Sequence, residues 1–308
     1  SLPGAVSLIE ALSKGRYENL ERVELGHEDI AFLQYTGGTT GVSKGAMLTH
    51  RNVLANMEQT GAWVSLIFTE GAEIAIAPLP LYHIFCLTAT LSFMKWGSLN
   101  VLITNPRDLP GLVKELGRWR WTIMTGVNTL FNGLLHAPGF DRLDFASVKA
   151  VIGGGAAVQK SVAERWQQVT GCSITEGYGL TEASPVVCAN PIGTPWNGTI
   201  GIPYPSTELT IRDAVFAELP PWTGEGDLEK FTGEICVRGP QVMKGYWNNP
   251  AETASAIVGG WLKTGDVGHV DPMGRVTITD RKKDMILVSG FNVYPNEVES
   301  IVAAHPGV

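Results

Sequence analysis

The sequence predicts an α/β fold, with a large domain of parallel sheets and flanking helices that includes a small β-barrel-like subdomain. Between residues 72 and 179, short apolar runs alternate with amphipathic ones, as in a parallel sheet covered by helices. After Pro185, short alternating runs separated by Gly and Pro indicate a small antiparallel sheet or barrel. A chain of 308 residues with 44% hydrophobic content can form two domains, or one large domain and part of another.

The elements of the first region follow from apolar continuity and helical spacing. Segments 6–12 and 48–59 read as helices that precede the alternating region. Within the alternating region, strands are expected at residues 74–77, 100–103, 122–124, 148–152 and 173–176. Helices are expected at residues 87–96, 109–119, 129–136 and 160–170. Val162, Trp166 and Val169 share one face of the last helix by their spacing.

The second region is expected to be β-rich, with strands at residues 208–211 and 234–237. The acidic stretch 213–232 carries two adjacent prolines and is expected to form an exposed loop. A strand at 285–288 and a helix opened by Pro295 close the sequence. One strand and one helix cannot bury a core, so we expect residues 283–308 to begin a small α+β C-terminal domain, with 285–308 poorly packed.

This pattern divides the chain into three parts. Residues 1–190 form the α/β part with a phosphate-binding loop, residues 191–282 the β-rich subdomain, and residues 283–308 a hinge and the start of the last domain.

Composition excludes several classes of protein. The 23 Lys+Arg and 30 Asp+Glu residues give a net charge of −7, against the basic surface of a nucleic-acid binder. The four cysteines form no CxxC pair, which favours a reducing compartment over a zinc site or disulfide framework. The longest clean apolar run, 84–94, is well short of the ~20 residues of a membrane-spanning helix. We expect a cytoplasmic protein; peripheral contact with the inner face of the membrane and a homodimer stay open.

Residues 35–45 carry the strongest chemical signal. Four glycines, three threonines and one lysine form a loop rich in backbone N–H groups and hydroxyls, which can surround phosphate oxygens while Lys44 adds a charge. It is not a Walker A loop, because Ser43 stands where that motif requires glycine. A flexible surface turn would not explain three threonines with a single lysine.

This loop resembles the phosphate loop of the acyl-adenylate-forming superfamily, which includes acyl-CoA synthetases, firefly luciferases and nonribosomal peptide adenylation domains. The family usually has proline at the position of Ser43, while the glycines, threonines and lysine are retained. The resemblance implies a large adenylate-forming domain that binds ATP and Mg²⁺. It assigns ATP contacts in the loop to Thr36, Gly37, Gly38, Thr39, Thr40, Gly41 and Lys44.

Residues 176–182 resemble the family motif that follows the phosphate loop. The resemblance places Tyr178 on adenine, Thr181 at the α-phosphate and Glu182 on Mg²⁺, a hard cation for which one or two protein carboxylates suffice. It counts Thr181, Glu182, Lys44 and His83 as catalytic. Residues 153–156, which follow a predicted strand, resemble the wall of the adenine and acyl pockets. The further ATP contacts implied are Gly154, Gly155, Ala156, Glu176, Gly177 and Gly179.

Three later segments complete the resemblance. Residues 261–266 match the segment whose aspartate, Asp266, binds the ribose hydroxyls, and residues 280–284 supply the ribose-contacting Arg281 and the hinge residue Lys283. Residues 289–292 match the loop at the thioester-forming site. The acyl and coenzyme A site is implied at His83, Val127, Gly153, Gly290 and Phe291.

Each residue also has a simpler explanation on its own. Glu182 can be a solvated surface carboxylate, Asp266 a turn residue and His83 a hydrogen-bonded core histidine. Five motifs in the family's order favour the functional interpretation.

Within the superfamily, several stretches resemble the bacterial long-chain fatty acid–CoA ligases. They are residues 33–52, 79–85, 105–116, 126–131 and 280–297. This resemblance implies activation of a fatty acid by ATP and transfer to coenzyme A. Relative to that family the chain lacks a long N-terminal portion and most of the C-terminal domain with its catalytic lysine, so the chain alone is expected to be inactive. A medium-chain or aryl acid ligase, and a module that only binds nucleotide, stay open.

Overall fold

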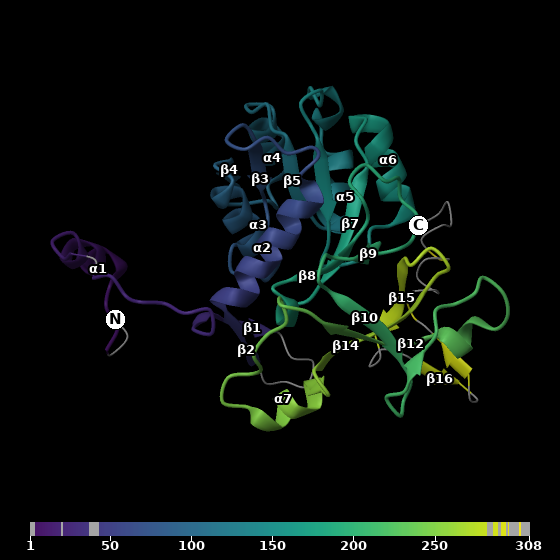
Figure 1. Cartoon of the computed structure of the whole chain (residues 1–308). Coiled ribbons are helices and arrows are strands. Elements are labelled where there is room, and N and C mark those ends of the chain that lie inside the picture. Colours follow the sequence, from purple (N-terminus) through teal and green to yellow (C-terminus); the bar gives the residue numbers. More distant parts are fainter. Residues whose placement is uncertain are drawn as a thin grey trace.

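The structure, a computed structural model, describes residues 4–19, 21–36, 43–281, 286–288 and 291–293, together with Pro295 and Val302. Its centre is a seven-stranded sheet in the order β4-β3-β5-β6-β7-β8-β9 (Figure 1). The first five strands in this order are parallel, and β8 and β9 are antiparallel additions. The strands are β3 (Ile74–Ala77), β4 (Leu99–Leu102), β5 (Ile123–Gly126), β6 (Ala150–Gly153), β7 (Ile174–Gly179), β8 (Val186–Ala189) and β9 (Ile202–Pro203).

Helices cover both faces of the parallel part. The helices are α2 (His50–Val64), α3 (Ile84–Lys95), α4 (Leu109–Leu116), α5 (Asn128–His136) and α6 (Lys160–Thr170). Alternate strand residues face opposite sides: Ile76 and Met124 pack in the core cluster built with α4, α5 and α6. Ala75 and Ile123 pack with Phe93 of α3 on the other face. The expected covered parallel sheet is confirmed.

The predicted boundaries differ mainly at helix ends. α6 matches its predicted range, whereas α3 begins at Ile84, three residues before the predicted start. The N–H of Phe85 donates to Nδ1 of His83, which caps the helix in place of the usual Ser, Thr, Asp or Asn. α2 runs to Val64, beyond the predicted end.

The β-rich part is a six-stranded antiparallel sheet in the order β11-β10-β12-β14-β13, with β15 also paired to β14. Its strands are β10 (Glu208–Arg212), β11 (Glu218–Leu219), β12 (Gly233–Arg238), β13 (Ile257–Val258), β14 (Trp261–Val270) and β15 (Val276–Arg281). The stretch predicted as a loop, 213–232, contains β11 and the short 3-10 helix η3 (Leu228–Phe231). That part of the prediction is wrong, because Leu219 pairs with Ile211 at the sheet edge.

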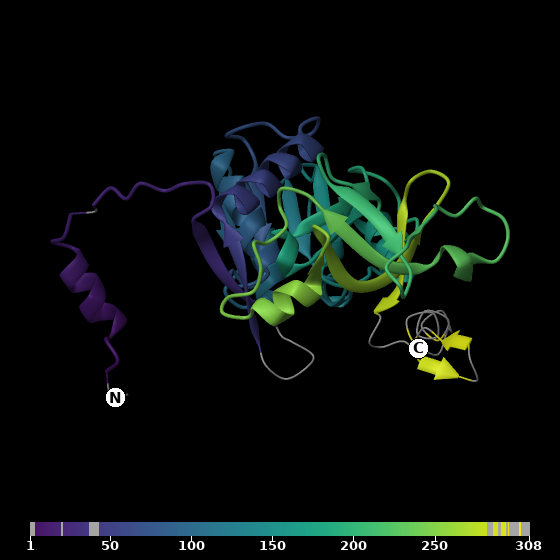
Figure 2. The ribbon, with the colours of Figure 1, turned by 60° about the horizontal axis from the view of Figure 1, so that its bottom comes forward.

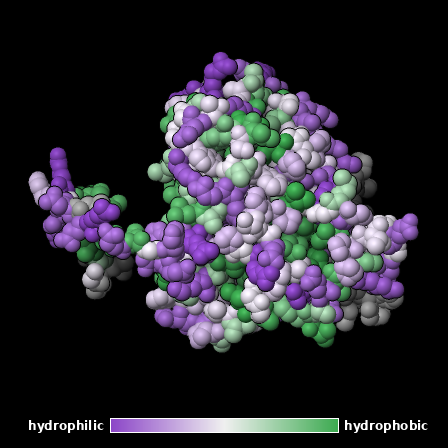
Figure 3. All heavy atoms as spheres, in the orientation of Figure 1, coloured by the Kyte–Doolittle hydropathy of each residue, from purple (hydrophilic) through white to green (hydrophobic). Residues whose placement is uncertain are grey.

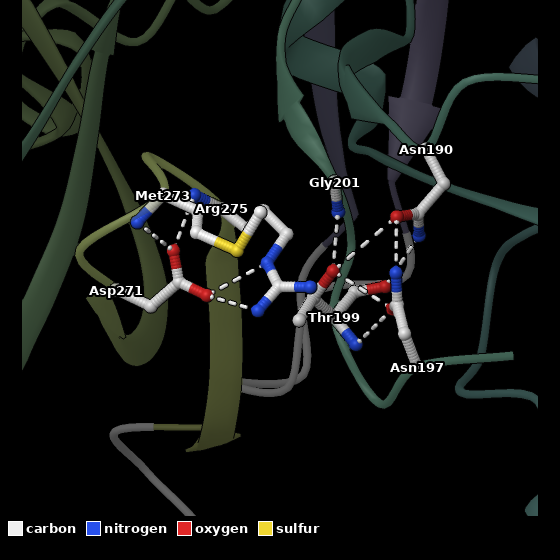
Figure 4. A network of polar contacts seen from close by, with 7 residues as sticks. All are labelled: Asn190, Asn197, Thr199, Gly201, Asp271, Met273 and Arg275. Carbon is white, nitrogen blue, oxygen red and sulfur yellow. Dashed lines mark hydrogen bonds and ion pairs between the residues drawn. The ribbon is translucent and has the colours of Figure 1, made fainter. Parts of the chain in front are cut away.

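Backbone hydrogen bonds join the two sheets where the segment before β9 passes β15. The Ile200 N–H donates to the Val276 carbonyl, and the Val276 N–H donates to Gly201. Figure 4 shows the polar side chains around this crossing. The Thr199 hydroxyl accepts the Gly201 N–H, and Oδ1 of Asp271 accepts the N–H groups of Met273 and Arg275 in the turn before β15. Gly201 has φ +82°, and a Cβ there would lie 2.1 Å from the backbone of Ala189. Only glycine fits this crossing.

A hairpin and a short helix lie beside the sheets. β1 (Ile30–Thr36) pairs antiparallel with β2 (Lys44–Thr49), and α7 (Pro250–Ala256) lies next to that hairpin in both ribbon views (Figure 2). β16 (Ile286–Val288) pairs with β17 (Phe291–Val293). The predicted strand 285–288 corresponds to β16, whereas the helix expected after Pro295 falls largely outside the described residues. Its expected poor packing stays a prediction.

α1 (Leu8–Gly15) stands away from the rest of the molecule (Figures 1 and 3). None of its side chains is buried, and Ile9 is 82% exposed. Among the residues that the structure describes, no helix is both long enough and apolar enough to cross a membrane.

Candidate functional site

The hairpin β1–β2 presents the two ends of the predicted phosphate loop. Thr36 is the last residue of β1 and pairs with Lys44, the first residue of β2. The Thr36 hydroxyl donates to the Lys44 carbonyl at 3.5 Å. The antiparallel register therefore sets both residues at the base of the loop. The other predicted loop contacts, Gly37, Gly38, Thr39, Thr40 and Gly41, lie outside the described residues.

Residues 243–247 run alongside β2 and carry an aromatic side chain into the site. The N–H of Met47 donates to the Gly245 carbonyl, and that of Trp247 to the Gly45 carbonyl, both at 2.8 Å. At the other end, the Met243 N–H donates to the carbonyl of Glu182. The backbone thus ties β2 and Glu182 to the same segment, with Tyr246 between them.

Lys44, Tyr246 and Glu182 form one cluster. The Tyr246 hydroxyl donates to Oε1 of Glu182 at 2.7 Å, and Lys44 Nζ lies 5.5 Å from the centre of the Tyr246 ring. Lys44 Nζ also contacts Oε2 of Glu252 at 2.6 Å. Residues far apart in sequence, on β2 and on η2 (Thr181–Ala183), therefore contact the same side chain.

The electrostatics of the cluster keep Tyr246 neutral. Burial raises the pKa of its phenol far above the usual 10.0, and the charges of Glu182 and Glu252 raise it further. Tyr246 is therefore a hydrogen-bond donor to Glu182 across the physiological range. Sequence reasoning missed Tyr246 and Glu252. The available signal was the run Lys244-Gly245-Tyr246-Trp247, in which two large aromatic residues follow a glycine.

A second cluster links the two sheets. The Tyr178 hydroxyl, on β7, donates to Oδ2 of Asp266 on β14 at 2.5 Å. Arg281 Nε lies 3.6 Å from the other oxygen of Asp266, and the two residues are paired in the β14–β15 register. Three of the predicted adenine and ribose contacts therefore lie together.

The two clusters are within electrostatic reach of each other. Burial raises the pKa of Asp266, and the charge of Glu182 raises it too, while Tyr178 and Arg281 lower it. Burial, followed by the Asp266 charge, raises the pKa of Tyr178 well above its usual value. Tyr246 and Tyr178 also pack in the same apolar core cluster, so the cluster of Lys44 and Glu182 adjoins the cluster of Tyr178 and Asp266.

At several glycines in and near the predicted pocket wall, a side chain would clash with neighbouring atoms. A Cβ at Gly153 would lie 2.8 Å from Val158 and 2.9 Å from Ile174, both core side chains. A Cβ at Gly154 would lie 3.2 Å from the Gly177 carbonyl, and one at Gly179 would lie 2.3 Å from a backbone oxygen. Gly153 thus faces the core, whereas Gly155 and Ala156 are exposed at the end of β6.

Glu176 lies on β7 beside these glycines. Its Oε1 accepts the Val158 N–H at 2.8 Å. Burial raises its pKa from 4.5 to about 7, and the Val158 hydrogen bond opposes that rise. The carboxyl of Glu176 therefore holds its proton at mildly acidic pH.

Two of the predicted acyl-site residues, Val127 and Gly153, lie at the carboxyl ends of the neighbouring strands β5 and β6. His83 caps α3 and burial lowers its pKa, so its ring is neutral near pH 7. Val127 precedes α5, and its side chain lies 3.7 Å from the Cβ position of Gly155. Gly290 and Lys283 lie outside the described residues, and Phe291 is described only as the first backbone position of β17.

The donor set fits magnesium better than a tightly held metal. Among the residues that the structure describes, no group of three His, Cys, Asp or Glu side chains could hold a metal ion. Mg²⁺ commonly uses one or two protein carboxylates and takes its remaining oxygens from water and phosphates. Glu182, with Oε1 already oriented by Tyr246, suits this mode of binding.

Three comparisons with known proteins bear on this arrangement. The chain is 54% identical to the long-chain-fatty-acid–CoA ligase of Escherichia coli O6:H1 (strain CFT073), over 100% of this chain and 54% of that protein. ATP-bound MatB from Rhodopseudomonas palustris aligns with a TM-score of 0.80 and 33% identity, over 94% of this chain and 55% of that one. The o-succinylbenzoate coenzyme A synthetase of Bacillus subtilis, solved with ATP and magnesium, aligns at 0.80 and 28%, over 96% and 60%.

The chain spans about half the length of the curated relatives it matches. The model of the family described as "AMP-binding enzyme" matches residues 5–247, which include the hairpin, the parallel sheet, Glu182 and Tyr246. On this match, the chain belongs to the AMP-binding enzyme family.

Proposed function

We propose that this chain is the nucleotide-binding part of an ATP-dependent ligase that activates long-chain fatty acids and transfers them to coenzyme A. The observation that carries the proposal is the cluster of Lys44, Tyr246 and Glu182 next to the cluster of Tyr178 and Asp266. The first cluster contains a cation suited to a triphosphate and a carboxylate suited to its metal ion. The second cluster contains groups suited to a nucleoside. The 54% identity to a fatty acid ligase supports the substrate class.

In the first step, the fatty carboxylate attacks the α-phosphorus of ATP in line, and pyrophosphate leaves. Lys44, with the threonines Thr36, Thr39 and Thr40, would bind the β- and γ-phosphates. Thr181 would contact the α-phosphate and Glu182 would hold Mg²⁺, which neutralises charge on the phosphates. The protein forms no covalent bond here, so positioning and charge stabilisation supply most of the rate.

The remaining residues would orient the nucleoside and the acyl group. Tyr178 would pack on adenine, while Asp266 and Arg281 would bind the ribose. The acyl carboxylate would lie near the neutral His83, with its chain directed past Val127 and residues 153–155 at the end of β6. In the second step, the thiol of coenzyme A attacks the acyl carbonyl and AMP leaves.

ATP–pyrophosphate exchange with palmitate tests this proposal. Lys44→Ala and Glu182→Ala should each lower the exchange rate about 100-fold, the effect of removing one charge-stabilising group. Lys95→Ala, which removes an exposed lysine paired with Glu58, is the matched control and should leave exchange unchanged. Unchanged exchange in the first two variants would refute the assigned roles.

A ligase for a medium-chain or aryl acid is the second candidate. The similarity in fold to an o-succinylbenzoate coenzyme A synthetase favours it, because that enzyme is named for an aromatic acid and was solved with ATP and magnesium. An activity profile over acids from benzoate to palmitate separates the two. A maximum at the aromatic acids would replace the fatty acid proposal.

A third candidate is a chain that binds ATP without turnover. The half-length match to the curated relatives favours it. Isothermal titration with ATP, run beside a coupled activity assay on the same sample, separates binding from chemistry. Heat of binding without product would support this candidate.

We also propose a cytoplasmic protein that collects its fatty acid at the inner face of the membrane. Vesicle flotation would test the membrane contact, and light scattering would test the homodimer. Protein that stays with the soluble fraction at every lipid composition would argue against membrane contact.

A further inference from the structure

We propose that Glu252 is a built-in competitor for the triphosphate: its carboxylate holds Lys44 until a nucleotide displaces it. This inference rests on the proposed function and adds a residue that the resemblance does not assign. The starting observation is that the predicted phosphate-binding amine already has an anionic partner, with 2.6 Å between Lys44 Nζ and Glu252 Oε2. A phosphate oxygen that binds Lys44 must compete with that carboxylate or approach a like charge.

The contact joins residues that are 208 positions apart, so it depends on the fold. The Lys44 side chain is only 21% exposed, which restricts the directions from which an anion can reach its amine. On one side lies the ring of Tyr246, and Glu252 takes another. Glu252 therefore occupies one of the few positions open to a phosphate oxygen.

The backbone that carries Glu252 is fixed while its side chain can turn away. Asn249 caps α7 by accepting the Glu252 N–H, and the Thr253 hydroxyl accepts the Tyr246 N–H and donates to the Asn249 carbonyl. None of the α7 side chains is buried, and that of Glu252 is 44% exposed. Rotation of the carboxylate into water therefore costs little free energy. The ion pair competes with the nucleotide for Lys44 and does not exclude it.

A partly exposed ion pair of this kind has a modest strength. We therefore expect Glu252→Gln to tighten ATP binding by about two- to fivefold in the 308-residue chain, as measured by isothermal titration. Glu58→Gln is the matched control, since it removes the same charge from another lysine–glutamate pair and should leave ATP affinity unchanged.

A second variant separates position from net charge. Ala251→Glu combined with Glu252→Ala keeps the net charge but moves the carboxylate about 100° around the helix. It should bind ATP as tightly as Glu252→Gln does. In the Lys44→Ala background, Glu252→Gln should have no effect, because the competitor has lost its partner. Equal tightening with and without Lys44 would overturn the proposal.

A measurement without ATP distinguishes this inference from the proposed function. The rate at which an amine-reactive ester acylates Lys44, followed by peptide mass spectrometry, should rise in Glu252→Gln and stay unchanged in Glu58→Gln. An unchanged Lys44 rate, or weaker ATP binding in Glu252→Gln, would refute the competitor role. A raised rate in a protein that does not bind ATP would instead refute the proposed function and leave the masking of Lys44 established.

Discussion

At the scale of single residues, Tyr246 is the side chain on which the site depends. Its hydroxyl orients Glu182 and its ring adjoins Lys44, so one residue touches both groups proposed to serve the triphosphate. A carboxylate that is held by a hydrogen bond presents its second oxygen in a defined direction. Groups that orient a metal ligand in this way commonly change metal affinity by 10- to 100-fold.

We expect Tyr246→Phe to raise the magnesium concentration needed for half-maximal ATP binding by about tenfold. The ring remains, so the midpoint of urea unfolding should change little. Tyr204→Phe, which alters a buried phenol in the core beside Trp63, is the control and should leave the magnesium requirement as it is. An unaltered magnesium requirement in Tyr246→Phe would show that the hydroxyl does not orient Glu182.

Glu176 gives a prediction about pH. Its pKa is about 7 in the folded protein and near 4.5 when exposed, so the folded state binds more protons between these values. Stability conferred by a raised pKa is present at low pH and is lost as pH rises through the folded value. Unfolding free energy should therefore fall between pH 5 and pH 7.5, by at most about 3 kcal/mol.

Glu176→Gln should remove this dependence, because the amide resembles the protonated acid at every pH. Glu164→Gln, on the exposed side of α6, should keep it. Urea titrations across the pH range measure both. Parallel curves for Glu176→Gln and the unaltered chain would show that Glu176 titrates normally.

Sequence reasoning singled out Lys44, Glu182, Tyr178 and Asp266, because each stands in a motif whose composition is unusual. Their roles in nucleotide binding stay predictions, while the structure shows that these side chains lie in two contact clusters. It could not find Glu252, since a glutamate in the first turn of a short helix is common. Nor could it find the Tyr178–Asp266 hydrogen bond, which joins strands of different sheets. Contacts of this kind depend on how the sheets pack, and no local pattern encodes that.

At the scale of elements, the parallel strands were predictable because they are buried on both faces and read as continuous apolar runs. β11 was not, because two residues at a sheet edge carry no periodicity and lie in an acidic stretch. The early start of α3 was also missed, since histidine is an uncommon cap.

The crossing between the sheets offers a matched test of glycine. Gly201 and Gly193 both have φ +82°, but only at Gly201 would a Cβ meet the backbone, 2.1 Å from Ala189. Gly193→Ala should cost about 1–2 kcal/mol from the left-handed conformation alone. Gly201→Ala should cost about 3–5 kcal/mol, because the clash adds to that strain.

Urea unfolding of the two variants measures the difference. Equal losses of stability in the two variants would mean that the backbone at the crossing can move apart with no loss of unfolding free energy.

At the scale of the whole molecule, α1 contributes nothing to the folded body. Its side chains are all exposed, and its capping by Ser7 is local. We expect a chain that begins at residue 26 to melt within about 2 °C of the 308-residue chain, since surface changes away from packed groups alter stability little. Calorimetry of both chains measures this.

A chain that begins at residue 34 is the contrasting control. It loses half of β1, which pairs with β2 through the whole hairpin, and should melt at a clearly lower temperature. Equal melting of all three chains would imply that the hairpin adds nothing either.

The position of Tyr178 on one sheet and of Asp266 and Arg281 on the other has a thermodynamic consequence. A nucleoside bound between these residues acts as a removable cross-link, which adds to the Ile200–Val276 crossing and to the apolar core that the two layers share. At one hundred times its dissociation constant such a ligand adds about 2.7 kcal/mol. Occupancy of the site would thus increase the cooperativity with which the two layers unfold.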